Sequence, residues 1–106
     1  MDLDAIAKEI ISAATKMGGN TWFRIQQSAP LYIRGYAQTL LDIAAGVAKG
    51  DISKSDAKMY SQTARLMLVQ GIANASHVLY SEVQKFIDSV LGIVKASITK
   101  ALAIPI

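Results

Sequence analysis

The strongest interruption of helical pattern in this chain lies near its centre, in the stretch AAGVAKGDISKSDAKMY, residues 44–60. A helical spacing of apolar residues stops there and restarts with the same period. Lys49 suits the negative end of a helix, and Gly50 supplies the left-handed residue that commonly follows one. Ser53, with Asp56 three residues later, is typical of a capped helix start. Because the link is only about three residues long, the two flanking helices must be antiparallel neighbours, so the sequence predicts a helical hairpin.

The first half of the chain predicts a short helix followed by the first arm of this hairpin. Over residues 2–17 apolar side chains recur at spacings of three and four, and two glycines end the pattern. A second pattern covers residues 21–49 but contains Pro30, which cannot donate a hydrogen bond inside a helix. Two interpretations follow: the helix kinks near Pro30, or Ser28 caps a fresh helix with Pro30 in its first turn.

The second arm of the hairpin is longer than the first. It covers residues 54–102, with apolar residues at spacings of three and four and no proline before Pro105. No stretch of the chain alternates apolar and polar residues as a strand would. We therefore expect one all-α domain over residues 1–106, a three- or four-helix bundle built on the hairpin. As a single helix the second arm would measure about 70 Å, whereas the first arm after Pro30 covers only about 30 Å.

This mismatch leaves an apolar face near the end of the second arm without a cover. The face consists of Phe86, Ile87, Val90, Leu91, Val94, Ile98 and Leu102. Three arrangements would bury it. The arm breaks near Ser81, where SEVQ resembles a capping box; the N-terminal helix lies along its far half; or the face meets copies of itself. We expect the last arrangement, an elongated hairpin completed by self-association, because charged residues are only 18% of the chain, against a usual share of about 25%.

No catalytic or metal-binding pattern is visible in the sequence. The chain has no cysteine, which excludes disulfides, thiolate nucleophiles and cysteine metal sites. The single histidine, His77, has no acidic residue three or four positions away that would complete a bundle metal motif, and no nucleophile motif surrounds it. We therefore expect a protein that is not an enzyme and that holds no metal or cofactor.

The region from Met17 to Leu41 is the one most typical of a binding site. It contains no Asp or Glu, and its candidate ligand-binding residues are Trp22, Arg24, Arg34 and Tyr36. Aromatic rings interleaved with guanidinium groups can hold a nucleotide or another anionic small ligand, particularly between copies. Packing of the aromatic rings in the core is the alternative interpretation. Two arginines are fewer than a dense basic face provides, so nucleic acid is not an expected partner.

The C-terminal stretch KASITKALAIPI suggests a different partner. Lys95 and Lys100 with no acid suit an amphipathic helix on an anionic membrane surface, although ordinary helix packing explains them equally well. We expect no transmembrane helix, because the longest stretch without a charged residue, 66–81, is 16 residues and a span needs about 20. The acidic start is unlike a signal peptide. Localisation stays open, and the cytoplasm or a viral or cellular assembly is compatible.

Together these features predict a self-associating helical subunit with a structural, scaffold or adaptor role. A homo-oligomer is the expected state, and other protein subunits are alternative partners. A small, cysteine-free, alanine-rich helical chain of this kind suits a viral or bacterial assembly. The two alternatives are an oligomeric binding module for a nucleotide or other anionic ligand, and a peripheral membrane protein.

Overall fold

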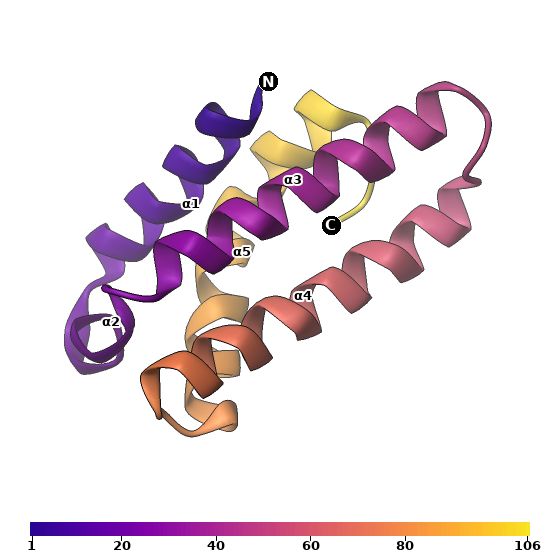
Figure 1. Ribbon diagram of the computed structural model, residues 1–106. Helices are drawn as coiled ribbons and strands as arrows, with labels where there is room; N and C mark the ends of the chain where they lie inside the picture. Colours follow the sequence, from indigo (N-terminus) through magenta and orange to yellow (C-terminus); the bar gives the residue numbers. More distant parts are fainter.

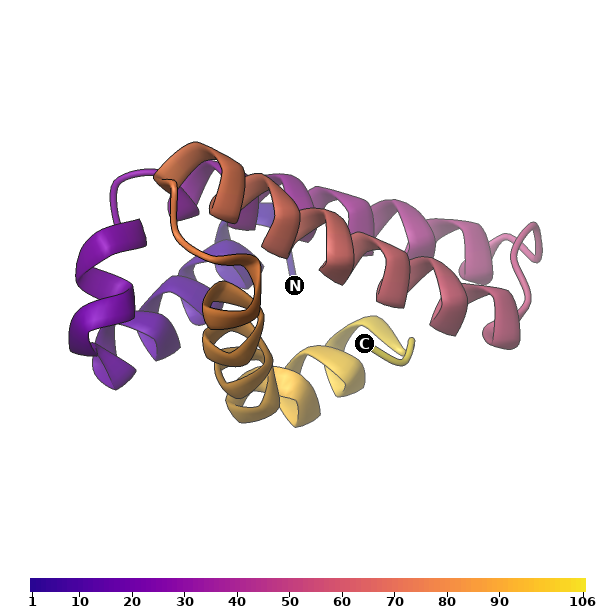
Figure 2. The same cartoon turned by 90° about the horizontal axis from the view of Figure 1, so that it is seen from below.

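The computed structural model describes all 106 residues and contains five helices and no strand. The helices are α1 (Leu3–Met17), α2 (Gly19–Ile25), α3 (Ala29–Ala48), α4 (Lys54–Ser76) and α5 (Tyr80–Leu102). The long antiparallel pair α3 and α4 forms one layer of the molecule (Figure 1). Figure 2 shows α1, α2 and α5 on one side of this layer. The predicted all-α bundle built on a central hairpin is confirmed.

The ends of α1 and the hairpin turn follow the local signals in the sequence. Asp2 begins α1 by accepting a hydrogen bond from the Ala5 amide at 2.8 Å, and Ser53 begins α4 by accepting one from the Asp56 amide at 3.1 Å. Gly50 adopts the left-handed conformation after α3, with φ of 81°. These ends were predictable because a cap involves only neighbouring residues.

The chain does not kink at Pro30; it starts a new helix there. α2 ends at Ile25, and Ser28 precedes α3, which carries Pro30 in its first turn. The first-turn amides of a helix have no partner within the helix, so the missing N–H of proline removes no bond there. The prediction of one kinked helix over residues 21–49 is therefore wrong, and the fresh helix after Ser28 is the correct alternative. The short α2 lies at the end of the molecule away from the hairpin turn (Figure 1).

The second arm of the hairpin is two helices. α4 ends at Ser76, His77 adopts a left-handed conformation with φ of 57°, and α5 begins at Tyr80. Leu79 is the residue that precedes α5, and no side chain caps this helix, so Ser81 does not form the predicted capping box. The break therefore comes slightly before the place that the sequence indicated, and an elongated continuous arm over residues 54–102 is wrong.

The apolar face of α5 is covered by the chain itself, because α1 packs against both α3 and α5. Of the seven residues predicted for self-association, Leu102 is partly buried and six are buried: Phe86, Ile87, Val90, Leu91, Val94 and Ile98. The assignment of this face to self-association is corrected accordingly. The break at His77 is the physical reason, since it lets α5 turn back onto α1 instead of extending into solvent.

The radius of gyration and the accessible surface of the chain are those of a compact monomer. The radius of gyration is 13.3 Å, and a folded domain of this length is expected near 13 Å. The accessible surface is 6026 Å², close to the roughly 5,800 Å² of a compact monomer of this mass. All five helices contribute fully buried side chains, among them Ile10, Ile25, Ile33, Ile72 and Ile87. The core therefore needs no second chain to form.

Candidate functional site

Two side chains of α2, Trp22 and Arg24, join this helix to α5, whereas Phe23 is exposed. The buried Trp22 ring stacks on Phe86, with centroids 6.1 Å apart and planes 12° from parallel. One nitrogen of Arg24 lies 3.0 and 3.2 Å from the two carboxylate oxygens of Glu82. The Thr21 hydroxyl donates to the same carboxylate at 3.0 Å. Trp22 and Arg24 therefore make their main contacts within the chain, with Phe86 and Glu82 of α5.

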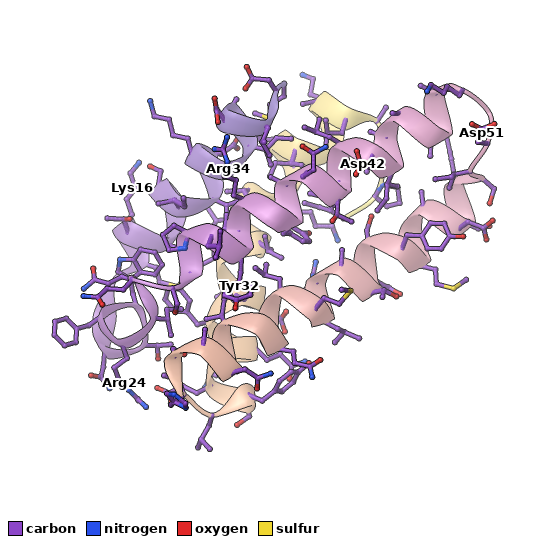
Figure 3. All side chains as sticks on the ribbon, in the orientation of Figure 1. Lys16, Arg24, Tyr32, Arg34, Asp42 and Asp51 are labelled. Carbon is purple, nitrogen blue, oxygen red and sulfur yellow. The ribbon has the colours of Figure 1, made fainter.

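The other two candidate ligand-binding residues lie elsewhere. Arg34 forms an ion pair with Asp4 at 2.6 Å, between α3 and α1. Tyr36 is buried at the contact of α3 with α4. Figure 3 shows Arg24 at the α2 end of the molecule, well away from Arg34. Because the chain turns between α2 and α3, one chain does not bring the four residues together.

The acidic residues and the single histidine do not form a cluster of the kind that binds a metal. No three of the acidic residues and His77 lie close enough to hold a metal ion. His77 itself is exposed at the end of α4. None of the five helices combines the length and the hydropathy that crossing a bilayer requires.

A mostly apolar groove with a volume of about 590 Å³ lies between α3 and α4. We call it the α3–α4 groove and define it by the residues that line it, all of which belong to these two helices. They are Leu31, Tyr32, Gly35, Tyr36, Thr39, Ile43, Tyr60, Thr63, Ala64, Met67 and Leu68. None of these residues is Asp, Glu, Lys, Arg or His. Figure 3 shows Tyr32 in the space between α3 and α4.

A glycine sets the register of the two helices that form the groove. A Cβ atom placed on Gly71 would lie 2.6 Å from Cε1 of Tyr32, so the Tyr32 ring rests directly on the α4 backbone. Since the helices are antiparallel, this contact places Tyr36 opposite Met67 and Ile43 opposite Tyr60, farther toward the hairpin turn. All four of these residues line the groove. The groove therefore has a Tyr32 end and an Ile43 end.

The rim of the groove carries large apolar side chains that remain in water. Leu31 is 73% exposed, Met67 67% and Tyr60 48%. α4 exposes two more such side chains, Met59 and Leu66. Exposed apolar side chains that gather on one stretch of surface are typical of an interaction site.

The sequence pattern did not reveal that Tyr60 and Met67 would be exposed, because the apolar residues of α4 are also compatible with a single stripe that faces the core. A signal was present: Leu66 and Met67 begin the longest stretch without a charged residue, residues 66–81. What the sequence did not specify is which side of α4 faces the core. That side is fixed by the way α5 folds back after His77.

The floor of the groove contains a buried hydroxyl without a partner. Tyr36 is only 3% exposed, and its hydroxyl lies near the Arg65 guanidinium without reaching the geometry of a hydrogen bond. Burial raises the pKa of Tyr36 to about 12, and the neighbouring Arg65 guanidinium lowers it in part. Tyr36 is therefore neutral at physiological pH and serves as an apolar surface toward the groove.

The lining of the groove offers a mostly apolar surface. Its hydroxyl groups, such as those of Thr39 and Thr63, have no base or acid among the lining residues to activate them. Comparison of the chain with protein-family models, with curated proteins and with solved structures found no match.

Proposed function

We propose that this chain is a non-enzymatic helical subunit that self-associates through the α3–α4 groove, in a structural or adaptor role. One observation carries the proposal: an otherwise closed bundle leaves an uncharged apolar groove with exposed Leu31, Tyr60 and Met67 on its rim. Removing apolar surface from water stabilises a complex by about 25 cal/mol per Å², so a protein surface that covers this rim gains free energy.

The two alternative functions have less support from the geometry. Binding of an anionic ligand requires free cations, yet Arg24 and Arg34 already face carboxylates at 3.0 and 2.6 Å. Binding of a membrane surface through the C-terminal helix requires an exposed apolar face. In α5 that face is packed inside the chain, and Ile93 is the one large apolar side chain of the helix beyond Tyr80 that stays exposed. Association with another protein chain uses the exposed apolar side chains on the rim of the α3–α4 groove.

Sedimentation equilibrium over a range of concentrations tests the proposal. We expect the apparent mass of the unmodified chain to rise with concentration above that of one chain. Met67→Asp places a charge on the rim of the groove, and we expect it to weaken association at least tenfold, which corresponds to about 1.4 kcal/mol. This is a conservative expectation, because burying one such side chain is worth about 1.5–3 kcal/mol.

Ile93→Asp is the matched control. Ile93 is 62% exposed, close to the 67% of Met67, but it lies on α5 and not in the groove. We expect this variant to associate as the unmodified chain does. Single chains at every concentration, or equal weakening by both substitutions, would contradict the proposal.

A further inference from the structure

We infer that the chain binds the phosphate group of a small molecule in a cavity of about 490 Å³, which lies between α4, α5 and the C-terminal residues of the chain. We call it the α4–α5 cavity and define it by the residues that line it. They are Lys58, Gln62, Arg65, Leu66, Gln84, Asp88, Lys95, Pro105 and Ile106. None of them lines the α3–α4 groove, so the inference does not depend on the proposed self-association.

The side chains that line this cavity carry an excess of positive charge. Lys58, Arg65 and Lys95 are cationic, and Asp88 is the one carboxylate among them. Neither lysine forms an ion pair within the chain. Like charges that surround one cavity repel each other, and an anion bound between them removes this repulsion. The electrostatics of the cavity therefore favour an anionic occupant.

Arg65 distinguishes the cavity from an ordinary charged surface. Its side chain is only 29% exposed, and its one ionic contact is with Asp88 at 3.5 Å, without the geometry of a hydrogen bond. A guanidinium group has several N–H donors in a planar fork. Arg24 and Arg34, in contrast, donate to carboxylates at 3.0 and 2.6 Å. Arg65 is therefore the arginine whose donors are left for another acceptor.

The buried hydroxyl groups that lack a hydrogen-bond partner lie on the residues next to these cations. There are three of them, on Tyr36, Ser61 and Thr99. The Tyr36 hydroxyl lies near the Arg65 guanidinium. Ser61 lies one turn before Arg65 on α4, and Thr99 lies one turn after Lys95 on α5, and side chains one turn apart are about 5–6 Å from each other. Because buried polar groups in proteins are nearly always hydrogen-bonded, this grouping supports a polar occupant of the cavity.

A phosphate group suits these donors better than a carboxylate does. It carries more negative charge at neutral pH and has three acceptor oxygens, and the arginine fork can bind two of them at once. The volume of about 490 Å³ lies within the range of small-molecule sites, about 300–1,000 Å³. Leu66, Pro105 and Ile106 give the cavity an apolar wall. We therefore expect the phosphate to belong to a small organic molecule whose remainder contacts this wall.

Titration with inorganic phosphate, followed by NMR at constant pH and constant ionic strength, tests the inference. Arg24, Arg34 and Arg65 are the only arginines of the chain, so each side-chain Nε–H signal can be followed separately. We expect the Arg65 signal to shift and to saturate, together with backbone amides of residues 58–66 and 84–95. The signals of Arg24 and Arg34 should stay in place, because these side chains already bind carboxylates.

Charge variants identify the groups that hold the phosphate. Lys58→Gln and Lys95→Gln should each weaken phosphate binding about tenfold, because each removes a charge-assisted contact. Both lysines are exposed, so neither change disturbs the core. Lys8→Gln is the matched control, since Lys8 is exposed on α1 and outside the cavity, and we expect it to bind as the unmodified chain does. Asp88→Asn should strengthen binding, because it removes the carboxylate that competes for Arg65.

Two further probes identify the source of the phosphate group. Phenyl phosphate should bind more tightly than inorganic phosphate, because its ring can contact the apolar wall of the cavity. Vesicles of phosphatidylcholine with phosphatidic acid present the same group on a lipid, and we expect them not to retain the chain in a flotation experiment. Retention that Lys58→Gln abolishes would assign the cavity to a lipid headgroup and overturn the assignment to a small molecule.

Three other results would overturn the inference. A fixed Arg65 signal would show that phosphate does not enter the cavity. Shifts of all three arginine signals without saturation, or equal weakening by Lys8→Gln, would show that phosphate acts only as a general counterion. None of these results bears on self-association, which Met67→Asp tests at a separate surface.

Discussion

At the scale of single residues, Tyr36 combines burial with an unsatisfied hydroxyl. Its ring fills the contact between α3 and α4, while its oxygen lacks a hydrogen bond. A buried polar group without a partner lowers stability relative to an apolar group of the same shape. Tyr36→Phe should therefore be neutral or slightly stabilising at neutral pH, and its larger effect should appear in alkali.

The pKa of Tyr36, raised from 10.0 to about 12 by burial, predicts the direction of that effect. The folded state favours the neutral phenol, so this contribution to stability is complete below pH 10 and is lost as the pH rises toward 12. We expect the unmodified chain to lose about 2 kcal/mol more unfolding free energy over this range than Tyr36→Phe does. Urea unfolding at each pH measures the difference. Tyr60→Phe is the control, since Tyr60 is about half exposed, and an equal pH dependence for Tyr36→Phe and the unmodified chain would refute the prediction.

At the scale of helices, Gly71 controls how closely α3 and α4 approach. We expect Gly71→Ala to destabilise the fold by about 1–3 kcal/mol, because the new methyl group would overlap the Tyr32 ring. Gly92→Ala is the control, since nothing lies within 4 Å of the added methyl group in α5. There the higher helix propensity of alanine should stabilise by up to about 1 kcal/mol. Thermal unfolding of both variants tests the pair, and stabilisation by both would mean that Tyr32 does not rest on Gly71.

Helix ends differ in how far the sequence predicts them. Asp2, Ser53 and Gly50 act through their own neighbours in the chain, so the start of α1 and the hairpin turn could be predicted. The end of α4 could not, because His77 occupies a left-handed conformation that costs a non-glycine residue about 1–2 kcal/mol. Packing of α5 on α1 must compensate for this cost, and such packing joins segments that are distant in the sequence.

The candidate site could not be predicted for the same reason: it depends on packing between segments that are distant in the sequence. The sequence indicated a surplus of apolar surface and placed it on the face from Phe86 to Leu102, which the structure buries inside the chain. Once α1 covers α5, three of the large apolar side chains that stay exposed, Leu31, Tyr60 and Met67, line the groove between α3 and α4. The predicted cluster of Trp22, Arg24, Arg34 and Tyr36 rested on the absence of acidic residues between Met17 and Leu41 and on aromatic residues interleaved with arginine. Because the chain turns before Ala29, these residues separate.

At the scale of the whole molecule, the central claim is that one chain buries the apolar face of α5 by itself and leaves the α3–α4 groove for association. Amide hydrogen exchange at two concentrations tests it most directly, with Met67→Asp as a variant expected to remain as single chains. We predict that the amides of α5 from Phe86 to Ile98 exchange as slowly in the dilute single chain as in the concentrated sample. Rapid exchange of these amides in the single chain, slowing as concentration rises, would show that copies cover α5 and would contradict the account.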